Sequence, residues 1–198
     1  MTRRLRYQVA MSLDGFIARP NGEYDWLVMD PAIDFAALFG EFDTAVMGRK
    51  TYDVLLSQGA LKDLAGLDVI VFSRTLAASE SRRVRIVNDQ PHQVVAALKA
   101  QQGRDIWLYG GGALFRSLLD AGLVDTVEVA VMPVLLGDGI PLLPAGTSTT
   151  SLVLADQRTL SASGIVVLAY TVEGTSGAAP RIGYVRSAED VGVGSPGA

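Results

Sequence analysis

Cysteine is absent from this chain of 198 residues, and histidine occurs only once, at His92. The lack of cysteine excludes disulfide bonds, thiolate catalysis and cysteine-ligated metals. A single histidine leaves no histidine pair for a metal ion, and its place after Pro91, at the start of an expected helix, indicates a surface residue. We therefore expect no metal site.

Long apolar runs and a basic stripe are missing too. No segment reaches the roughly 18 apolar residues of a membrane-spanning helix, and the N-terminus lacks the pattern of a secretory leader. The net charge is −4 and the pI about 5.0, unlike a nucleic-acid-binding protein. We expect a cytoplasmic protein that acts on a small molecule, with neither a nucleic acid nor a membrane as partner.

The chain does contain ample apolar material, arranged in alternating strand-like and helix-like segments. Hydrophobic residues make up 49% of it, enough to bury a core. Apolar strands separated by helices indicate βαβ units and a parallel sheet covered on both faces. The prediction is an α/β fold of three layers (αβα), its central sheet mostly parallel with an antiparallel C-terminal edge. Strands are expected at residues 5–10, 44–47, 68–72, 85–87, 106–109, 126–132, 152–160 and 165–172. Helices are expected at residues 31–42, 91–102 and 112–120, and a further helix is expected to begin near residue 48.

The composition changes after Glu173. Residues 174–198 are rich in Gly, Ser, Ala and Pro and show little periodicity. We interpret residues 1–173 as one domain and residues 174–198 as a tail, which Tyr184 and Val185 are best suited to anchor.

The first candidate binding segment is Met47-Gly48-Arg49-Lys50-Thr51-Tyr52, where a short strand feeds a helix. A helix N-terminus exposes amide groups and the positive end of its dipole. Gly48 would admit a phosphate, Arg49 and Lys50 add positive charge, and Thr51 adds a hydroxyl. The alternative is an ordinary turn with two solvated cations.

The second segment, Val71-Phe72-Ser73-Arg74-Thr75, also follows an apolar strand. In open α/β sheets, ligands bind beyond the carboxyl ends of the strands. Ser73 and Arg74 suit a ribose 2′-phosphate, because arginine binds phosphate through a planar fork. A polar loop without a ligand is the alternative.

The third segment, Leu108-Tyr109-Gly110-Gly111-Gly112-Ala113-Leu114-Phe115, places three glycines between a strand and a helix. Such turns let a pyrophosphate touch backbone amides. The dinucleotide fingerprint G-x-G-x-x-G is met only in part, because Phe115 occupies the third glycine position. A tight turn that allows close packing of helix and sheet is the alternative.

One ligand with separated phosphates would explain all three segments, because each lies at a strand end on the same side of a parallel sheet. Arg49 and Arg74 favour a cofactor with an extra phosphate. The predicted cofactor is therefore NADPH rather than NADH.

The motifs S-L-D-G, M-G-R-K-T-Y, V-F-S-R-T, Y-G-G-G-A-L and P-V-L-L-G-D-G occur in this order. From about Arg4 to Val172 the chain resembles the dihydrofolate-reductase-like family, which includes the reductase domain of riboflavin biosynthesis. The resemblance implies a role in cofactor binding for four groups of residues. The cofactor phosphates would be bound by Gly48, Arg49, Lys50 and Thr51, and the adenosine ribose by Ser73, Arg74 and Thr75. The pyrophosphate and nicotinamide would be lined by Gly110, Gly111, Gly112, Ala113 and Leu114, and the nicotinamide would also be bordered by Val9, Ala10 and Ile17.

The substrate half is less well defined. Trp26 resembles the tryptophan on the loop after the first strand in dihydrofolate reductases, and Met11 could line the same flat pocket. Asp30 and Asp34 lie near the carboxylate that binds pterin in those enzymes, but neither is clearly in register. The zinc deaminase domain common in riboflavin enzymes is missing, since its pattern needs cysteine.

Asp14, in the loop after the first strand, is the candidate to orient the substrate or to relay a proton. A carboxylate can donate near neutral pH only if burial raises its pKa. Asp14-Gly15 could instead be a simple turn, with water as the proton source. The apolar loop 133–144 could close the site or form a homodimer contact, as the resemblance implies.

Three functions remain open. The first is an NADPH-dependent reductase of a pteridine- or pyrimidine-type heterocycle. The second is a stand-alone 5-amino-6-(5-phosphoribosylamino)uracil reductase, whose substrate phosphate would need further cations, with Arg19 and Lys62 as weak candidates. The third is a non-catalytic NADP(H)-binding module.

Overall fold

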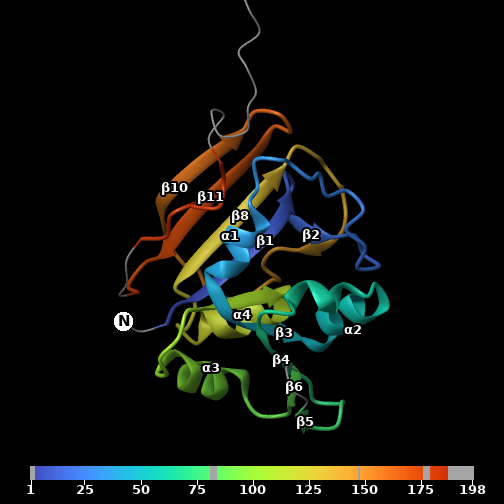
Figure 1. Ribbon diagram of the computed structural model, residues 1–198, viewed down its shortest axis with the longest axis vertical. Coiled ribbons are helices and arrows are strands. Elements are labelled where there is room, and N and C mark those ends of the chain that lie inside the picture. The colour runs from blue at the N-terminus through green and yellow to red at the C-terminus, as the bar shows by residue number, and fades with distance from the viewer. Residues whose placement is uncertain (1–2, 81–83, 147, 176–178, 187–198) are drawn as a thin grey trace, which may run out of the picture.

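The computed structural model describes residues 3–80, 84–146, 148–175 and 179–186. A nine-stranded sheet of order β10-β11-β8-β1-β7-β3-β4-β6-β5 runs through the molecule (Figure 1). Within this part of the chain, no helix is long and apolar enough to span a membrane. The strands are β1 (Leu5–Ser12), β2 (Phe16–Ala18), β3 (Phe42–Gly48), β4 (Asp68–Phe72), β5 (Ser79–Glu80), β6 (Val84–Val87), β7 (Asp105–Gly110), β8 (Thr126–Met132), β9 (Ile140–Pro141), β10 (Leu152–Leu160) and β11 (Ile165–Val172).

The six strands from β8 to β6 pair in parallel, whereas β11 and β10 continue the sheet antiparallel. This confirms the predicted sheet. Two short pairings, β2 with β9 and β5 with β6, were not predicted. The helices are α1 (Phe35–Gly40), α2 (Arg49–Ser57), α3 (Pro91–Lys99), α4 (Gly112–Asp120) and the 3-10 helix η1 (Ala60–Leu64).

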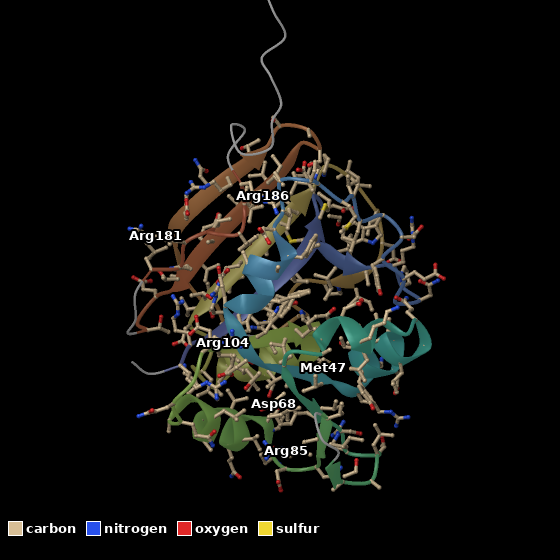
Figure 2. The ribbon with its side chains drawn as sticks, in the orientation of Figure 1. Met47, Asp68, Arg85, Arg104, Arg181 and Arg186 are labelled. Carbon is tan, nitrogen blue, oxygen red and sulfur yellow. The ribbon has the colours of Figure 1, made fainter. Side chains whose placement is uncertain are left out.

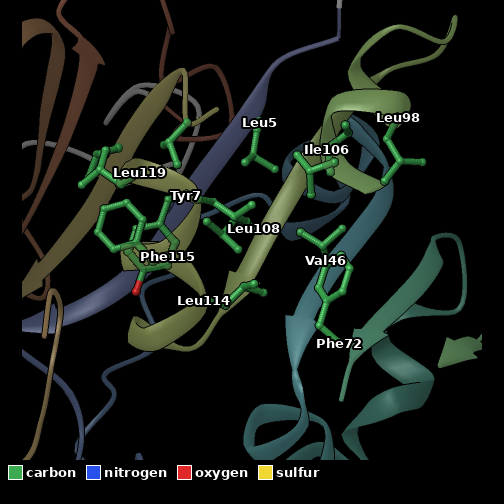
Figure 3. Close-up of a cluster of buried hydrophobic side chains, with 14 of the residues drawn as sticks. Leu5, Tyr7, Val46, Phe72, Leu98, Ile106, Leu108, Leu114, Phe115 and Leu119 are labelled. Carbon is green, nitrogen blue, oxygen red and sulfur yellow. The ribbon is translucent and has the colours of Figure 1, made fainter. Parts of the chain in front are cut away.

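Hydrophobic clusters on both faces of the sheet hold the layers together. On one face, α3 and α4 pack onto alternate residues of β1, β3 and β7, and the ring of Tyr7 stacks on Phe115 with centroids 3.9 Å apart (Figure 3). On the other face, α1, α2 and η1 cover a cluster that includes Met47 and Trp107. Apolar side chains alternate between faces along each strand, so both layers form from the same strands.

The helix predicted at 31–42 is shorter than expected. It begins after Asp34, whose side chain accepts a hydrogen bond from the amide of Ala37 (2.9 Å), and it ends at Gly40. Phe42 continues the helical spacing of apolar residues but begins β3, where its ring stacks on Trp107 (5.1 Å). Packing in the sheet therefore overrides the local periodicity.

The C-terminal segment also packs on the sheet. Tyr184, expected as an anchor, is 4% exposed, and Val185 forms an antiparallel bridge with Ile33. Ile182, which was not singled out from the sequence, is 2% exposed.

Candidate functional site

The three glycine- and cation-bearing segments meet at one edge of the sheet. β3 lies between β4 and β7 and is parallel to both, so Gly48, Ser73 and Gly110 follow neighbouring strand ends on the same side. In Figure 2, Met47 marks the carboxyl end of β3, and Arg104 precedes the amino end of β7. The structure thus brings together the residues predicted to bind phosphates.

Two helix N-termini open at this edge, and both begin with a glycine cap. Gly48 caps α2 and Gly111 caps α4, in each case without a side-chain hydrogen bond to the first-turn amides. A Cβ at Gly48 would meet no atom within 4 Å, whereas one at Gly111 would lie 3.3 Å from the Thr51 hydroxyl. Thr51 therefore lies between the two turns, and first-turn amides without a side-chain cap are the kind of donors that can bind an anion.

Gly112 packs closely against the loop after β8. A Cβ there would lie 2.9 Å from Pro144 Cδ and 3.0 Å from the carbonyl oxygen of Pro141. The alternative of close packing therefore holds for this glycine, with the loop after β8 rather than the sheet as the neighbour. Gly110 and Gly111, joined by a cis peptide bond, are the members of the run that face Thr51.

The loop after β4 is held by its own side chains. The Ser73 hydroxyl is nearly buried and accepts from the amide of Leu76 (2.9 Å), while Asn88 Nδ2 donates to the Ser73 carbonyl (2.5 Å). Ser73 thus shapes the loop, with Asn88 as a partner that sequence reasoning missed. Arg74 is exposed.

The Arg49 guanidinium joins the first two segments. It donates to the Thr75 hydroxyl and also forms an ion pair with Asp53 (3.2 Å). Arg49, Lys50 and Arg74 are all exposed, so three cations border the uncapped helix starts.

The residues at the end of β1 lie on opposite faces. Val9 and Met11 pack against the α3–α4 cluster, whereas Ala10 packs against the cluster that contains Trp26. Met11 and Trp26 therefore do not line one pocket, which corrects the expectation for Met11. Residues one apart on a strand point to opposite faces. The other predicted nicotinamide neighbours, Ile17 on β2 and Ala113 and Leu114 on α4, flank the same edge.

Asp30 and Asp34 differ sharply. Both carboxylate oxygens of Asp34 are engaged, by the Ala37 amide and by Arg186 Nη2 (3.0 Å), and these bonds lower the pKa of Asp34. Asp30 is buried. Its Oδ1 accepts from the Ala32 amide (2.8 Å), but its Oδ2 has no partner among the described residues.

Trp26 is buried as well, and its Nε1 likewise has no hydrogen-bond partner in the described part of the chain. An unpaired buried polar atom costs about 1–3 kcal/mol. One donor (Trp26 Nε1) and one acceptor (Asp30 Oδ2) on the same loop are thus buried without a partner among the described residues.

Asp14 does not meet the condition for a proton donor. Its exposed carboxylate accepts from the Ser12 hydroxyl (2.6 Å) and from the amides of Leu136 and Gly137 (3.0 and 2.7 Å). These hydrogen bonds, above all the one from Ser12, lower the pKa of Asp14. Gly137, with φ of +77°, supplies the turn that presents its amide. Asp14 ties the loop after β1 to the loop after β8.

Tyr109 was given no role from the sequence. It ends β7 beside the glycine turn, its ring lies 4.9 Å from that of Trp107, and burial raises its pKa to about 12. Two open hollows, of about 300 and 260 Å³, lie elsewhere, near the amino ends of β4, β6 and β7. Lys62 lines one of them, so it lies away from the candidate site.

Comparison with known proteins gives consistent matches. The model of the RibD C-terminal domain family matches residues 3–167. The Bacillus subtilis (strain 168) protein YyaP is 35% identical over 179 residues, covering 85% of this chain and 94% of YyaP. A solved structure from Shewanella sp. PV-4, named for riboflavin biosynthesis, is 28% identical with a TM-score of 0.74, covering 87% of this chain and 99% of that one.

Dihydrofolate reductase from Enterococcus faecalis, solved with NADP(H), shares the fold at 15% identity, with a TM-score of 0.64 over 87% of this chain and 99% of that one. The resemblance and the three-layer fold predicted from the motifs are thereby confirmed.

Proposed function

Because this chain belongs to the RibD C-terminal domain family, we propose that it is an NADPH-dependent reductase of a pteridine- or pyrimidine-type heterocycle. One observation carries the proposal. Two glycine-capped helix N-termini and three exposed cations border the same edge of a parallel sheet. This donor set fits a ligand with several phosphates.

The residues present fit NADPH. Amides at the starts of α2 and α4 would hold the pyrophosphate, with the Thr51 hydroxyl between them. Arg74 and Arg49 would hold the 2′-phosphate, because both are exposed beside Thr75. When bound, the cofactor supplies a hydride from nicotinamide C4. A reductase of the same fold, that of E. faecalis, is solved with NADP(H).

The chain's own contribution to the reaction is orientation of the substrate. Asp30 Oδ2 would accept from a ring N–H or amino group of the heterocycle, and Trp26 Nε1 would donate to its carbonyl oxygen. Reduction of a C=N bond adds one hydride to carbon and one proton to nitrogen, with NADP⁺ as the oxidised product. We take water as the source of that proton, because hydrogen bonds lower the pKa of Asp14.

A second candidate is reduction of 5-amino-6-(5-phosphoribosylamino)uracil. Family membership and the Shewanella match favour it. The weak point is the substrate phosphate, since Arg19 is paired with Asp25 (2.6 Å) and Lys62 lies near another edge. A non-catalytic NADP(H)-binding module is the third candidate.

A spectrophotometric assay separates these candidates. Purified protein is mixed with NADPH and, in turn, dihydrofolate, dihydrobiopterin and 5-amino-6-(5-phosphoribosylamino)uracil, and absorbance at 340 nm is followed. We expect NADPH oxidation with one of them. Tight NADPH binding without turnover of any compound would support the module, and no binding of NADPH would contradict the proposal.

We also propose that two copies associate through β10, the edge strand of the sheet. Leu152, Val153 and Leu154 are 41%, 54% and 48% exposed there, and no described strand pairs with the outer edge of β10; such an edge with aliphatic side chains favours pairing. Sedimentation should show a dimer that Val153→Asp converts to monomer. Leu135→Asp, in the loop after β8, is the control. If only that variant is a monomer, the dimer contact lies in this loop and not at β10.

A further inference from the structure

Residues 181–186, hereafter the strap, lie beyond the part of the chain that the family model matches. They run across the sheet near β11 towards the start of α1 (Figure 1). Figure 2 shows Arg181 at the β10–β11 side and Arg186 above α1. Two inward side chains, Ile182 and Tyr184, are 2% and 4% exposed, so the strap is packed rather than loosely attached.

The strap is fastened at both ends. At its start, the Ile182 amide donates to Asp156 Oδ2 on β10 (3.0 Å). At its end, the Asp34 amide donates to the carbonyl of Tyr184 (2.7 Å), and the Arg186 amide donates to the carbonyl of Ala32 (2.8 Å).

An ion pair between Arg186 and Asp34 (3.0 Å) completes the attachment. Residues 32–34 therefore pair with the strap as a short antiparallel ladder.

This ladder fixes the segment that begins with Asp30. The carboxylate of Asp30 is bonded to the Ala32 amide, and the Ala32 carbonyl is bonded to the strap. Tyr184 and Trp26 belong to the same hydrophobic cluster. The ion pair Arg19–Asp25 and the hydrogen bond between Tyr24 and Gln58, which also involve this loop, are exposed.

We propose that the strap is a positioning element for the substrate side of the site, which holds Asp30 and Trp26 in place. The assignment of this side to the substrate rests on the proposed function, whereas the inference that the strap holds Asp30 and Trp26 in place does not. Among the described residues, no hydrogen bond or ion pair joins the strap to the strand ends of β3, β4 and β7 that form the cofactor edge, so we expect loss of the strap to leave NADPH binding intact.

Two truncated chains test the proposal. One ends at Pro180 and lacks the strap, whereas the matched control ends at Arg186 and keeps it. Hydrogen exchange of residues 24–34 and of 106–115 is compared, and NADPH affinity is measured by calorimetry. We expect faster exchange at 24–34 only in the chain ending at Pro180, with the NADPH Kd within twofold of the full chain in both.

Turnover adds a readout that a purely structural role would not produce. With whichever of dihydrofolate and 5-amino-6-(5-phosphoribosylamino)uracil the full chain reduces, the chain ending at Pro180 should show a KM raised at least tenfold. If neither compound is reduced, the proposed function fails while the exchange data still decide on the strap. Unchanged exchange at 24–34, or a parallel loss of NADPH affinity, would overturn the positioning role.

Point variants of the full chain cover the case in which the shorter chain does not fold. Arg186→Ala removes the ion pair to Asp34, and Arg181→Ala, an exposed arginine of the same segment, is its control. Arg186→Ala alone should speed exchange at 30–34. Equal exchange in both variants would contradict the proposal.

Discussion

The cofactor edge and the substrate side of this protein are built in different ways. The cofactor edge consists of strand ends, glycine caps and exposed cations that are adjacent in sequence, and its donors are mostly backbone amides. The substrate side depends on two buried polar side chains, Trp26 and Asp30, in a loop that a strap about 150 residues later holds in place. Backbone donors tolerate sequence change, whereas side-chain donors in a loop can be altered one by one.

This comparison suggests how one fold can keep its cofactor and vary its substrate. Helix N-termini bind phosphate through atoms that every residue has. A buried carboxylate accepts hydrogen bonds only from donors in matching positions, and the residues that pack around it fix its own position. Substitutions at the cofactor edge should therefore impair cofactor binding alone, and substitutions at the substrate side should impair substrate binding alone.

Asp30→Asn should have the largest effect. Removing the charge from the acceptor weakens a charge-assisted hydrogen bond worth about 1.5–3 kcal/mol, so kcat/KM should fall by about 100-fold. NADPH affinity should remain unchanged, because Asp30 lies outside the cofactor edge. Steady-state kinetics at 340 nm and calorimetry with NADPH measure the two quantities. Asp25→Asn, at an exposed carboxylate of the same loop, is the control, and an equal loss there would contradict the role of Asp30.

Arg74→Ala should have a smaller effect on the opposite half. Loss of one guanidinium at an exposed site should weaken NADPH binding by about tenfold while leaving NADH binding nearly unchanged. Fluorescence titration with both cofactors makes NADH the internal control. Equal weakening of the two would show that Arg74 does not face a 2′-phosphate.

The sequence predicts that the three glycine- and cation-bearing segments meet at one edge of the sheet, because its signals are local. A strand end, a glycine and a cation occur within six residues at Met47–Tyr52, and a parallel sheet aligns all such ends. Helix 31–42 was drawn too long because Phe42 fits the helical spacing while its ring packs in the sheet on Trp107. Local periodicity contains no information about that tertiary contact.

The substrate side could not be predicted for the same reason. Whether Asp30 or Asp34 keeps a free oxygen depends on Arg186, which lies 152 positions from Asp34 in a segment with the composition of a tail. Ile182 carries no signal beyond its hydrophobicity. The partners of Asp14 could not be predicted either, because the amides of residues 136 and 137 come from another loop.

Two glycine variants sharpen the comparison within the cofactor edge. Gly112→Ala places a Cβ against Pro144 and should destabilise the fold by about 1–3 kcal/mol in urea unfolding. Gly48→Ala meets open space and should change stability by only a few tenths to about 1 kcal/mol, yet should reduce NADPH affinity severalfold. A large loss of stability in Gly48→Ala would mean that this glycine, too, serves packing.

Asp14→Asn should have the smallest effect, confined to stability. Hydrogen bonds lower the folded-state pKa of Asp14, so its carboxylate stabilises the fold above its unfolded pKa of about 3.9, and this contribution is lost as pH falls through the lower folded pKa. The variant should therefore show a slightly reduced Tm at pH 7, and the difference from the unmodified protein should vanish once the pH lies below the folded-state pKa of Asp14.

Turnover should stay near its original value in Asp14→Asn, since the group is already ionised and exposed at neutral pH. The pH profile of kcat/KM is the decisive measurement. If the variant loses a basic or acidic limb of that profile, Asp14 takes part in proton transfer. The loops that Ser12 and Gly137 join would then contribute to the reaction and not only to the stability of the fold.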